Sequence, residues 1–305
     1  MVTPVAHRLR VALPWLGAAL LLAWAFRSVS ITALGAALHS GPWLRLAGFA
    51  VLEVAALLAV DAWATRVALA QTGICLGYPE VAEIRGATYL LGLVNYAVGQ
   101  GGIGVYLARR GADSARSAGI VFFLLVTNGL ALLVGLGLGL VLDAAPELDP
   151  YRPLALLIAA GVLAYLVVVA SWPRSLRRWS LLDPLQQAGI GGHLRSFAAR
   201  LAHLGVLLVG NWVALRLWGI EAPFSTAFSR LPVVVFGSAL PVTPNGVGAV
   251  QALQVPLFAA WAPGAEAATR AASVLAFSLA HQGLGLLCQG IVGMACLARL
   301  RRGRQ

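Results

Sequence analysis

Lysine is absent from this sequence, and charged residues of any kind are scarce. Of its 305 residues, 11% are charged, whereas a soluble domain usually carries about 25%. The sequence is instead 60% hydrophobic, with a mean hydropathy of +0.84. A soluble fold has too little interior to bury so much apolar sequence. The scarcity of charge therefore excludes a soluble protein and predicts an integral membrane protein.

The basic residues number 22, all of them arginine, and give a net charge of +11. Arginine suits bidentate phosphate recognition, but the coding bias of a GC-rich genome produces the same composition, and both interpretations remain open. The arginines lie mostly in short links that flank apolar runs, as the positive-inside rule describes. The sequence pI of about 10.9 therefore does not indicate nucleic-acid binding.

Recognisable catalytic and metal-binding motifs are also missing. The three cysteines, Cys75, Cys288 and Cys296, have neither metal-ligand spacing nor an even count. The sequence contains no nucleophile elbow, no P-loop, no His-Glu-x-x-His motif and no Asp-rich cluster. We therefore expect no enzyme activity, no cofactor and no metal.

Six apolar runs approach or exceed the roughly 20 residues that cross a bilayer as a helix. The first follows basic residues in the manner of a signal peptide, but a counterpart later in the chain favours an uncleaved span. The runs are 11–26, 43–62, 114–141, 153–171, 201–218 and 271–298.

Two further apolar stretches, 79–108 and 223–262, are each interrupted by a Gly/Pro-rich break, at 98–104 and at 241–248. The Arg-rich segment 172–200 and the C-terminal tail favour the cytoplasm, and the acidic segment 142–152 favours the outside. When the membrane crossings between these points are counted, each stretch starts and ends on the same side, 79–108 inside and 223–262 outside. The sequence therefore predicts an all-α membrane protein of six full spans and two re-entrant helical hairpins.

The two hairpins also match each other in sequence. Pro79 and Gly102 recur as Pro223 and Gly246, at an offset of 144 residues. The same offset carries the first span onto the fourth. We expect one transmembrane domain with two pseudo-repeats, about 1–142 and 150–300, and a cytoplasmic amphipathic linker at about 172–200. Three crossings per half make this an inverted repeat, although chance agreement of Gly and Pro remains an alternative.

In an inverted repeat the hairpin tips meet near the midplane, and helix N-termini there favour an anion such as a lipid phosphate. Glycines allow the backbone to approach a ligand closely. Alternatively, the polar groups only satisfy the broken backbone. The candidate substrate-binding residues of the two breaks are Asn95, Gln100, Gly102, Gly104, Thr243, Asn245, Gly246, Gly248, Gln251 and Gln254.

Several ionisable residues fall within apolar segments, where charge is costly and indicates function by default. Glu53 and Asp61 share nearly one helix face and are candidates for proton coupling or for a structural ion pair. Arg85 and Arg230 are candidates for guiding a headgroup phosphate, with snorkelling to the interface as the alternative. In the last span, His281, Gln282 and Gln289 face either the cavity or a neighbouring helix.

Residues 98–102 and 107–111, and above all Leu-Pro-Val-Thr-Pro-Asn-Gly-Val-Gly at 240–248, resemble motifs of the flippase-like family typified by the membrane half of bacterial lysylphosphatidylglycerol synthases. The resemblance covers most of the chain and implies re-entrant hairpins and movement of lipids between leaflets. Gln251 stands where the family carries Glu, and the family's charged residues are missing around 103–107 and 126–128. These differences argue against a cationic or proton-coupled headgroup.

The expected function is that of a lipid flippase or lipid-linked-precursor transporter in a bacterial inner membrane, with both termini cytoplasmic. Its expected partners are a phospholipid or lipid-linked substrate, the bilayer, and either a second copy or a lipid enzyme. The alternative function is a non-transporting scaffold subunit for a lipid-modifying or glycolipid-synthesis enzyme. Because the sequence ends at Gln305, a synthase domain is not expected.

Overall fold

The computed structural model of the chain is helical throughout the part that it describes, with α-helices and short 3-10 turns and no strand there. The described residues are 4–27, 29–94, 96–143, 145, 148–149, 152–173, 176, 179–240 and 243–302. For residues 4–14 and 96 the description is limited to the backbone.

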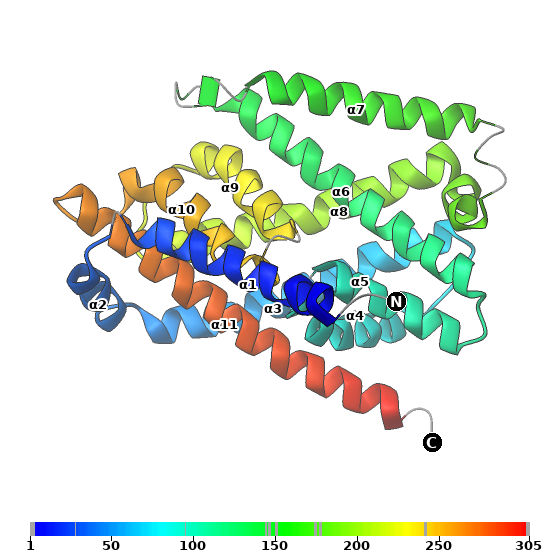
Figure 1. Cartoon of the computed structure of the whole chain (residues 1–305), viewed down its shortest axis with the longest axis horizontal. Helices are drawn as coiled ribbons and strands as arrows, with labels where there is room; N and C mark the ends of the chain where they lie inside the picture. Colours follow the sequence, from blue (N-terminus) through cyan, green and yellow to red (C-terminus); the bar gives the residue numbers. More distant parts are fainter. Residues whose placement is uncertain are drawn as a thin grey trace.

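Five helices are long and apolar enough to cross a membrane. By length and composition they agree with five of the six predicted spans. One of them, α7 (Arg152–Ser171), lies along one edge of the molecule (Figure 1). The sixth prediction, 11–26, falls in α1 (Pro4–Phe26), which qualifies only together with α2 (Ile31–His39) across a bend of 95°. The five are α3 (Trp43–Gln71), α6 (Ser114–Leu142), α7 (Arg152–Ser171), α8 (Asp183–Leu217) and α11 (Ala267–Arg302).

Four shorter helices form two packed pairs. The first pair is α4 (Tyr78–Gly92) with α5 (Tyr96–Arg109), and the second is α9 (Phe224–Ala239) with α10 (Ala249–Phe258). They hold 15, 14, 16 and 10 residues, so at 1.5 Å per residue each is shorter than a hydrocarbon core of roughly 30 Å. In Figure 1 the first pair lies toward the end where α11 finishes, and the second pair lies toward the opposite end.

The first break was predicted at 98–104, and this position is wrong, because α5 is helical throughout 96–109. The chain instead turns at Leu93–Val94; Asn95 lies outside the described residues. The glycines of α5 serve helix packing: a Cβ on Gly99 would lie 3.1 Å from the Cα of Gly92, and one on Gly104 would lie 2.9 Å from Val121 Cγ2. Close packing offsets the roughly 1 kcal/mol that each glycine costs in a helix.

The second break is confirmed. Helix α9 ends at Ala239 and α10 begins at Ala249, with a turn at 243–248 between them; residues 241 and 242 are outside the described part. Asn245, Gly246 and Gly248 have φ of 45°, 72° and 88°, a left-handed region that Asn and Gly tolerate best. The Asn-Gly pair therefore makes this turn, as its sequence predicts.

The predicted linker 172–200 overlaps a helix, because α8 begins inside it. Helix α8 starts at Asp183 and continues past residue 200, with non-helical φ and ψ at Gly189 alone. Arg200, the last residue of the predicted linker, lies in this helix and is almost fully buried. Arg200 forms an ion pair with the buried Asp61, so its charge does not require a position outside the bundle.

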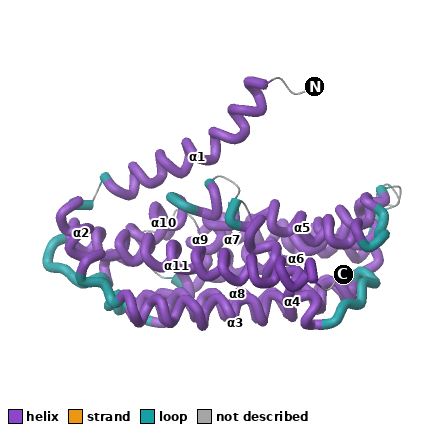
Figure 2. The backbone as a smooth tube through the Cα atoms, turned by 90° about the horizontal axis from the view of Figure 1, so that it is seen from below, coloured by secondary structure: helices purple, strands orange, loops and turns teal. Residues whose placement is uncertain are grey.

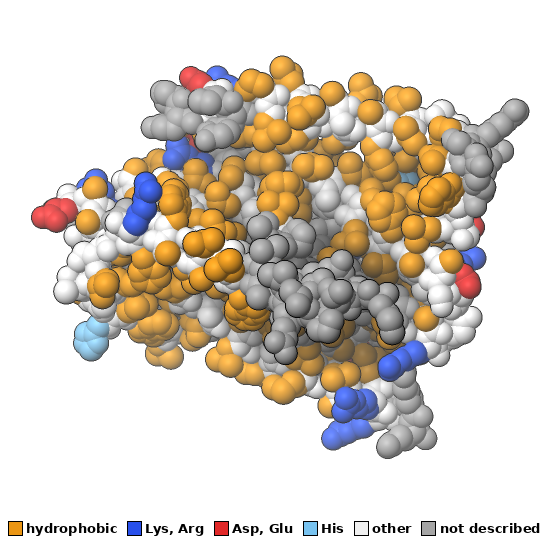
Figure 3. Space-filling model, in the orientation of Figure 1, with side chains coloured by type: hydrophobic (Ala, Val, Ile, Leu, Met, Phe, Trp, Pro, Cys, Tyr) orange, Lys and Arg blue, Asp and Glu red, His pale blue; other side chains and the backbone are white. Residues whose placement is uncertain are grey.

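The bundle is apolar around its middle and charged at its two ends. Figure 3 shows a broad hydrophobic surface between charged groups at the ends of the molecule. Helix α7 exposes Leu156, Leu157 and Leu163 by 64% or more, a large apolar surface of the kind that faces lipid. Helix α1 lies outside the main bundle (Figure 2) and packs on α10. The exposed apolar surface of the bundle, including that of α7, supports a multi-pass membrane protein.

Candidate functional site

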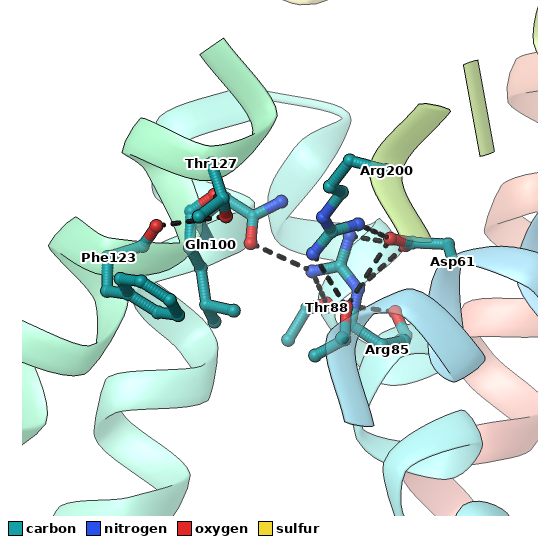
Figure 4. Close-up of polar contacts among 9 residues, drawn as sticks. Asp61, Arg85, Thr88, Gln100, Phe123, Thr127 and Arg200 are labelled. Atoms are coloured by element: carbon teal, nitrogen blue, oxygen red, sulfur yellow. Dashed lines mark hydrogen bonds and ion pairs between the residues drawn. The ribbon is translucent and has the colours of Figure 1, made fainter. Parts of the chain in front are cut away.

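A buried carboxylate that binds two arginines lies at the centre of the bundle. Asp61 of α3 accepts hydrogen bonds from Arg85 Nε of α4, at 2.7 Å, and from Arg200 Nη1 of α8, at 2.6 Å. Their exposed fractions are 2%, 5% and 1%. Figure 4 shows both arginines reaching the carboxylate. The cluster joins three helices and carries a formal charge of +1.

Arg85 also links this cluster to the second helix of the first short pair. Its Nη1 donates to Gln100 Oε1, at 3.3 Å, and to Thr88 Oγ1, at 3.4 Å. Gln100 lies on α5 and is fully buried. One guanidinium therefore connects α3, α4 and α5 near the turn of the first pair, as Figure 4 shows.

A second buried carboxylate lies on the same helix, two turns before Asp61. Glu53 Oε2 is 2.7 Å from His281 Nε2 of α11. Gly210 of α8 makes room for the carboxylate, because any Cβ at this position would collide with Glu53 Oε1. The histidine ring stacks on Phe277, with ring centroids 5.4 Å apart. The predicted acidic candidates Glu53 and Asp61 therefore each have a partner, which is partly buried for Glu53 and buried for Asp61.

These two clusters border two adjoining cavities, called lobes here, whose linings combine polar and apolar side chains. The arginine lobe, of about 200 Å³, is lined by Asp61, Arg85, Thr88, Tyr89, Gly92, Gly99, Gln100 and His203. The amide lobe, of about 180 Å³, is lined by Glu53, Asn211, Ser238, Gln254, Ser278, His281 and Gln282. Leu57, Leu207, Asn245 and Gln289 line both lobes.

The turns of both short pairs reach these lobes. Asn245, in the second turn, shares the arginine lobe with Gly92 and Gly99 of the first pair. His281, Gln282 and Gln289 of the last span line the amide lobe, and His281 and Gln282 also bond to neighbouring segments. The two lobes therefore bring together residues of both short pairs and of the last span.

The N-terminus of α10 already has protein partners. Gln251 Oε1 accepts from the Gly248 N–H at 2.7 Å, and Gln251 Nε2 donates to Gln282 Oε1 at 2.8 Å. Gln282 in turn donates to the Asn245 carbonyl at 2.9 Å. Thr243 is buried, and its Oγ1 has no hydrogen-bond partner within the described part of the chain. Gln251 therefore serves the backbone of the break rather than the cavity.

Gly102 and Gly104 lie away from both lobes. Gly102 borders an apolar groove of about 550 Å³ between α4, α5 and α11, which has Arg109 and Arg301 among its lining residues. Gly104 packs on α6. Neither glycine is at a turn, so the sequence match with Gly246 and Gly248 does not extend to the local backbone.

Arg230 is also outside both lobes. Its Nε donates to Asp143 at 2.8 Å, its Nη1 donates to the Leu257 carbonyl, and its guanidinium lies over the Trp261 ring. Burial opposes the charge of Asp143, but hydrogen bonds from Arg230, the Ala145 N–H and Ser229 outweigh it and hold the pKa of Asp143 below its ordinary value. Arg230 therefore stabilises one end of the bundle in this structure.

Sequence reasoning missed Arg200, His203, Asn211, Ser238 and Ser278. Arg200 lies 139 residues from Asp61, so no local spacing could connect them. A signal was nonetheless present, because an acidic residue inside a span needs a cationic partner. Such a cationic partner was to be sought among the basic residues near the other spans, and Arg200 of α8 is one of them.

Among the described residues, no group of three or more His, Cys, Asp or Glu could hold a metal ion. The sequence model of the family described as Lysylphosphatidylglycerol synthase TM region matches residues 8–288. Among curated proteins, no sequence matches this chain.

Proposed function

The chain belongs to the Lysylphosphatidylglycerol synthase TM region family, and we propose that it moves a lipid with an anionic headgroup between the leaflets of a membrane. The family match confirms the resemblance found in the sequence, and the proposed role is that of a lipid flippase or lipid-linked-precursor transporter. The observation that carries the proposal is the pair of adjoining lobes at the centre of an apolar bundle, next to two buried arginines.

The arginine lobe suits a phosphate. Arg85 and Arg200 share one carboxylate, which leaves the cluster with a charge of +1, and guanidinium donors match phosphate oxygens in geometry. Arg85 lines the lobe directly. Arg200 is not among the lining residues and is linked to the lobe through the Asp61 carboxylate that both arginines bind. A lipid phosphate entering the lobe would therefore meet excess positive charge in a low-dielectric interior, where electrostatic attraction is strong.

The apolar groove beside the first pair supports a lipid rather than a free solute. Thr88 lines both the groove and the arginine lobe, so the two spaces meet at this residue. An acyl chain in the groove would place its headgroup next to Arg85. The groove is also the space that Gly102 keeps open, because a Cβ there would lie 2.8 Å from atoms of Leu91 and Thr88.

We interpret the two short pairs as opposed re-entrant hairpins in an inverted repeat. The order of α1, α3, α4–α5 and α6 recurs as α7, α8, α9–α10 and α11. Helix α4 packs on α11, and α9 packs on α6, so each pair packs on the last helix of the other half. Such halves, related by an inverted topology, place a substrate site at their interface.

The proposed setting is a bacterial inner membrane with both termini in the cytoplasm. The ends of α5 and α11 carry Arg109, Arg301 and Arg302 at one end of the bundle, which supports that side as cytoplasmic. The proposed partners are the lipid substrate and the bilayer. We propose no enzyme activity, and a scaffold for a lipid enzyme is the outcome to which failed transport would point.

Reconstitution in liposomes tests the proposal. Fluorescent phospholipids would be followed by reducing the outer-leaflet label with dithionite, in vesicles with protein and in empty vesicles. We expect Arg85→Gln to slow transport at least about tenfold, because it removes about 1.4 kcal/mol or more of charge-assisted binding. The matched control is Arg152→Gln, which removes an exposed ion pair with Asp149. Transport no faster than in empty vesicles for every lipid of a broad panel would overturn the proposal.

A further inference from the structure

The amide lobe contains buried polar atoms that no protein group satisfies. Gln254 and Ser278 are each only 1% exposed, and both line the lobe. Gln254 Oε1 and Ser278 Oγ have no hydrogen-bond partner within the described residues. Buried polar atoms in native proteins nearly always have partners, so these two atoms indicate a polar guest.

The chemistry of the lobe identifies the kind of guest. Gln254 Oε1 needs a donor, and the unpartnered Ser278 hydroxyl can donate as well as accept. The side-chain amide of Gln289, which also lines the lobe, can likewise donate and accept. An ammonium group offers donors only. A hydroxyl group both donates and accepts, so a ring with several hydroxyls matches a wall of amides and hydroxyls better than an amine does.

The carboxylate of the lobe does not favour an amine either. Glu53 Oε2 is already 2.7 Å from His281 Nε2. A cationic headgroup would have to compete with this histidine for the carboxylate, whereas Gln254 and Ser278 are available without displacing a partner.

We infer that the amide lobe receives a polyhydroxylated headgroup, of the sugar or polyol class, while the phosphate of the same lipid occupies the arginine lobe. This rests on the proposed function and names its substrate class. The two lobes share the wall formed by Leu57, Leu207, Asn245 and Gln289, so a headgroup linked directly to its phosphate can fill both. Their volumes of about 180 and 200 Å³ together reach the lower part of the range for small-molecule sites, roughly 300–1,000 Å³.

The test compares two acyl-labelled lipids in the same proteoliposomes, phosphatidylinositol and phosphatidylethanolamine, which carry the same phosphate but different headgroups. We expect the inositol lipid to move about five- to tenfold faster, the factor that one or two neutral hydrogen bonds supply. Gln254→Leu should remove this preference, so that the ratio of the two transport rates falls to about one. Gln186→Leu, at an exposed position of α8, is the matched control.

A second measurement covers the case in which Gln254→Leu folds poorly. Inositol 1-phosphate should raise the melting temperature of the wild-type protein in detergent, and phosphoethanolamine should raise it less. Equal transport of both lipids, or Gln254→Leu slowing both equally, would refute the polyol assignment while leaving lipid transport intact. If neither lipid nor any other moves, the proposed function fails and the assignment fails with it.

Discussion

The ionic cluster around Asp61 predicts an unusual pattern of stability. Asp61→Asn leaves two buried arginines without their anion, whereas Arg200→Gln alone leaves a balanced pair of Asp61 and Arg85. Removing one partner of a buried ion pair costs about 3–5 kcal/mol. At roughly 2–4 °C per kcal/mol, Asp61→Asn should lower the melting temperature by about 6–20 °C.

The informative comparison is the double variant. Arg200→Gln should destabilise the wild-type protein, but it should restabilise Asp61→Asn, because it removes one of two unpaired buried charges. The non-additive energy should reach at least about 1 kcal/mol, as for residues in one ionic network. Intrinsic fluorescence of the nine tryptophans reports the melting temperature in detergent. If Arg200→Gln lowers it equally in both backgrounds, the proposed coupling of these charges is wrong.

Three further outcomes follow from the packing and the charges. Gly102→Leu should slow lipid transport because its side chain obstructs the apolar groove. Gly101→Leu is the control and should not slow transport, because a new Cβ there meets nothing within 4 Å. Equal rates for the two variants would contradict the role of the groove. Gly210→Ala should destabilise the protein by about 1–3 kcal/mol through collision with the buried glutamate of the amide lobe, and Gly205→Ala, also without neighbours within 4 Å, should leave its melting temperature unchanged. The folded pKa of Asp143 lies below its unfolded value of about 3.9, so the stabilisation by Asp143 is present above that pH and is lost as the pH falls through the folded pKa. The difference in melting temperature between wild type and Asp143→Asn should therefore disappear in strong acid. A difference that stays constant would exclude this linkage.

The membrane class and most of the helices could be predicted from the sequence because each depends on a local property. A run of about 20 apolar residues is sufficient to predict a span, and five such runs are long helices in the structure. The Asn-Gly turn at 245–246 was also readable, because few residues tolerate positive φ.

The first turn could not be placed in the same way. Glycine allows a turn and also allows close helix packing, and the sequence at 98–104 does not distinguish them. In the structure, the close approach of Gly99 to Gly92 shows that packing is what these glycines provide. Gly102 is therefore tested through its effect on the groove.

Substitution of Gly246 by leucine is a weak test of ligand binding at the second turn. Gly246 has φ of 72°, and a Cβ there would lie 2.9 Å from Ser238 Cα. A leucine would strain the backbone whether or not a ligand binds nearby. Variants such as Arg85→Gln and Gln254→Leu change the chemistry of the cavity with the backbone left in place.

The partners of the buried acids depend on contacts that no spacing reveals. Glu53 and His281 are 228 residues apart, and Asp61 and Arg200 are 139 apart. Sequence reasoning found both acids because charge inside a span is costly. It could not assign their partners, since the crossing of α3 with α8 and α11 brings them together.

The membrane topology has its own test. Single cysteines at residues 145 and 305, in a background without the three native cysteines, should be labelled from opposite sides of the membrane by an impermeant maleimide. Labelling of both positions from one side would rule out the proposed arrangement of six spans and two hairpins.

The most direct measurement is to ask where a lipid headgroup sits during transport. A phospholipid with a photoreactive diazirine in its headgroup, activated in proteoliposomes, should label peptides that contain Leu57, Asn245 and Gln289, which line both lobes. Arg85→Gln should reduce this labelling. Labelling confined to outer surfaces such as Leu156–Leu157 of α7, with none at the three cavity positions, would contradict the account.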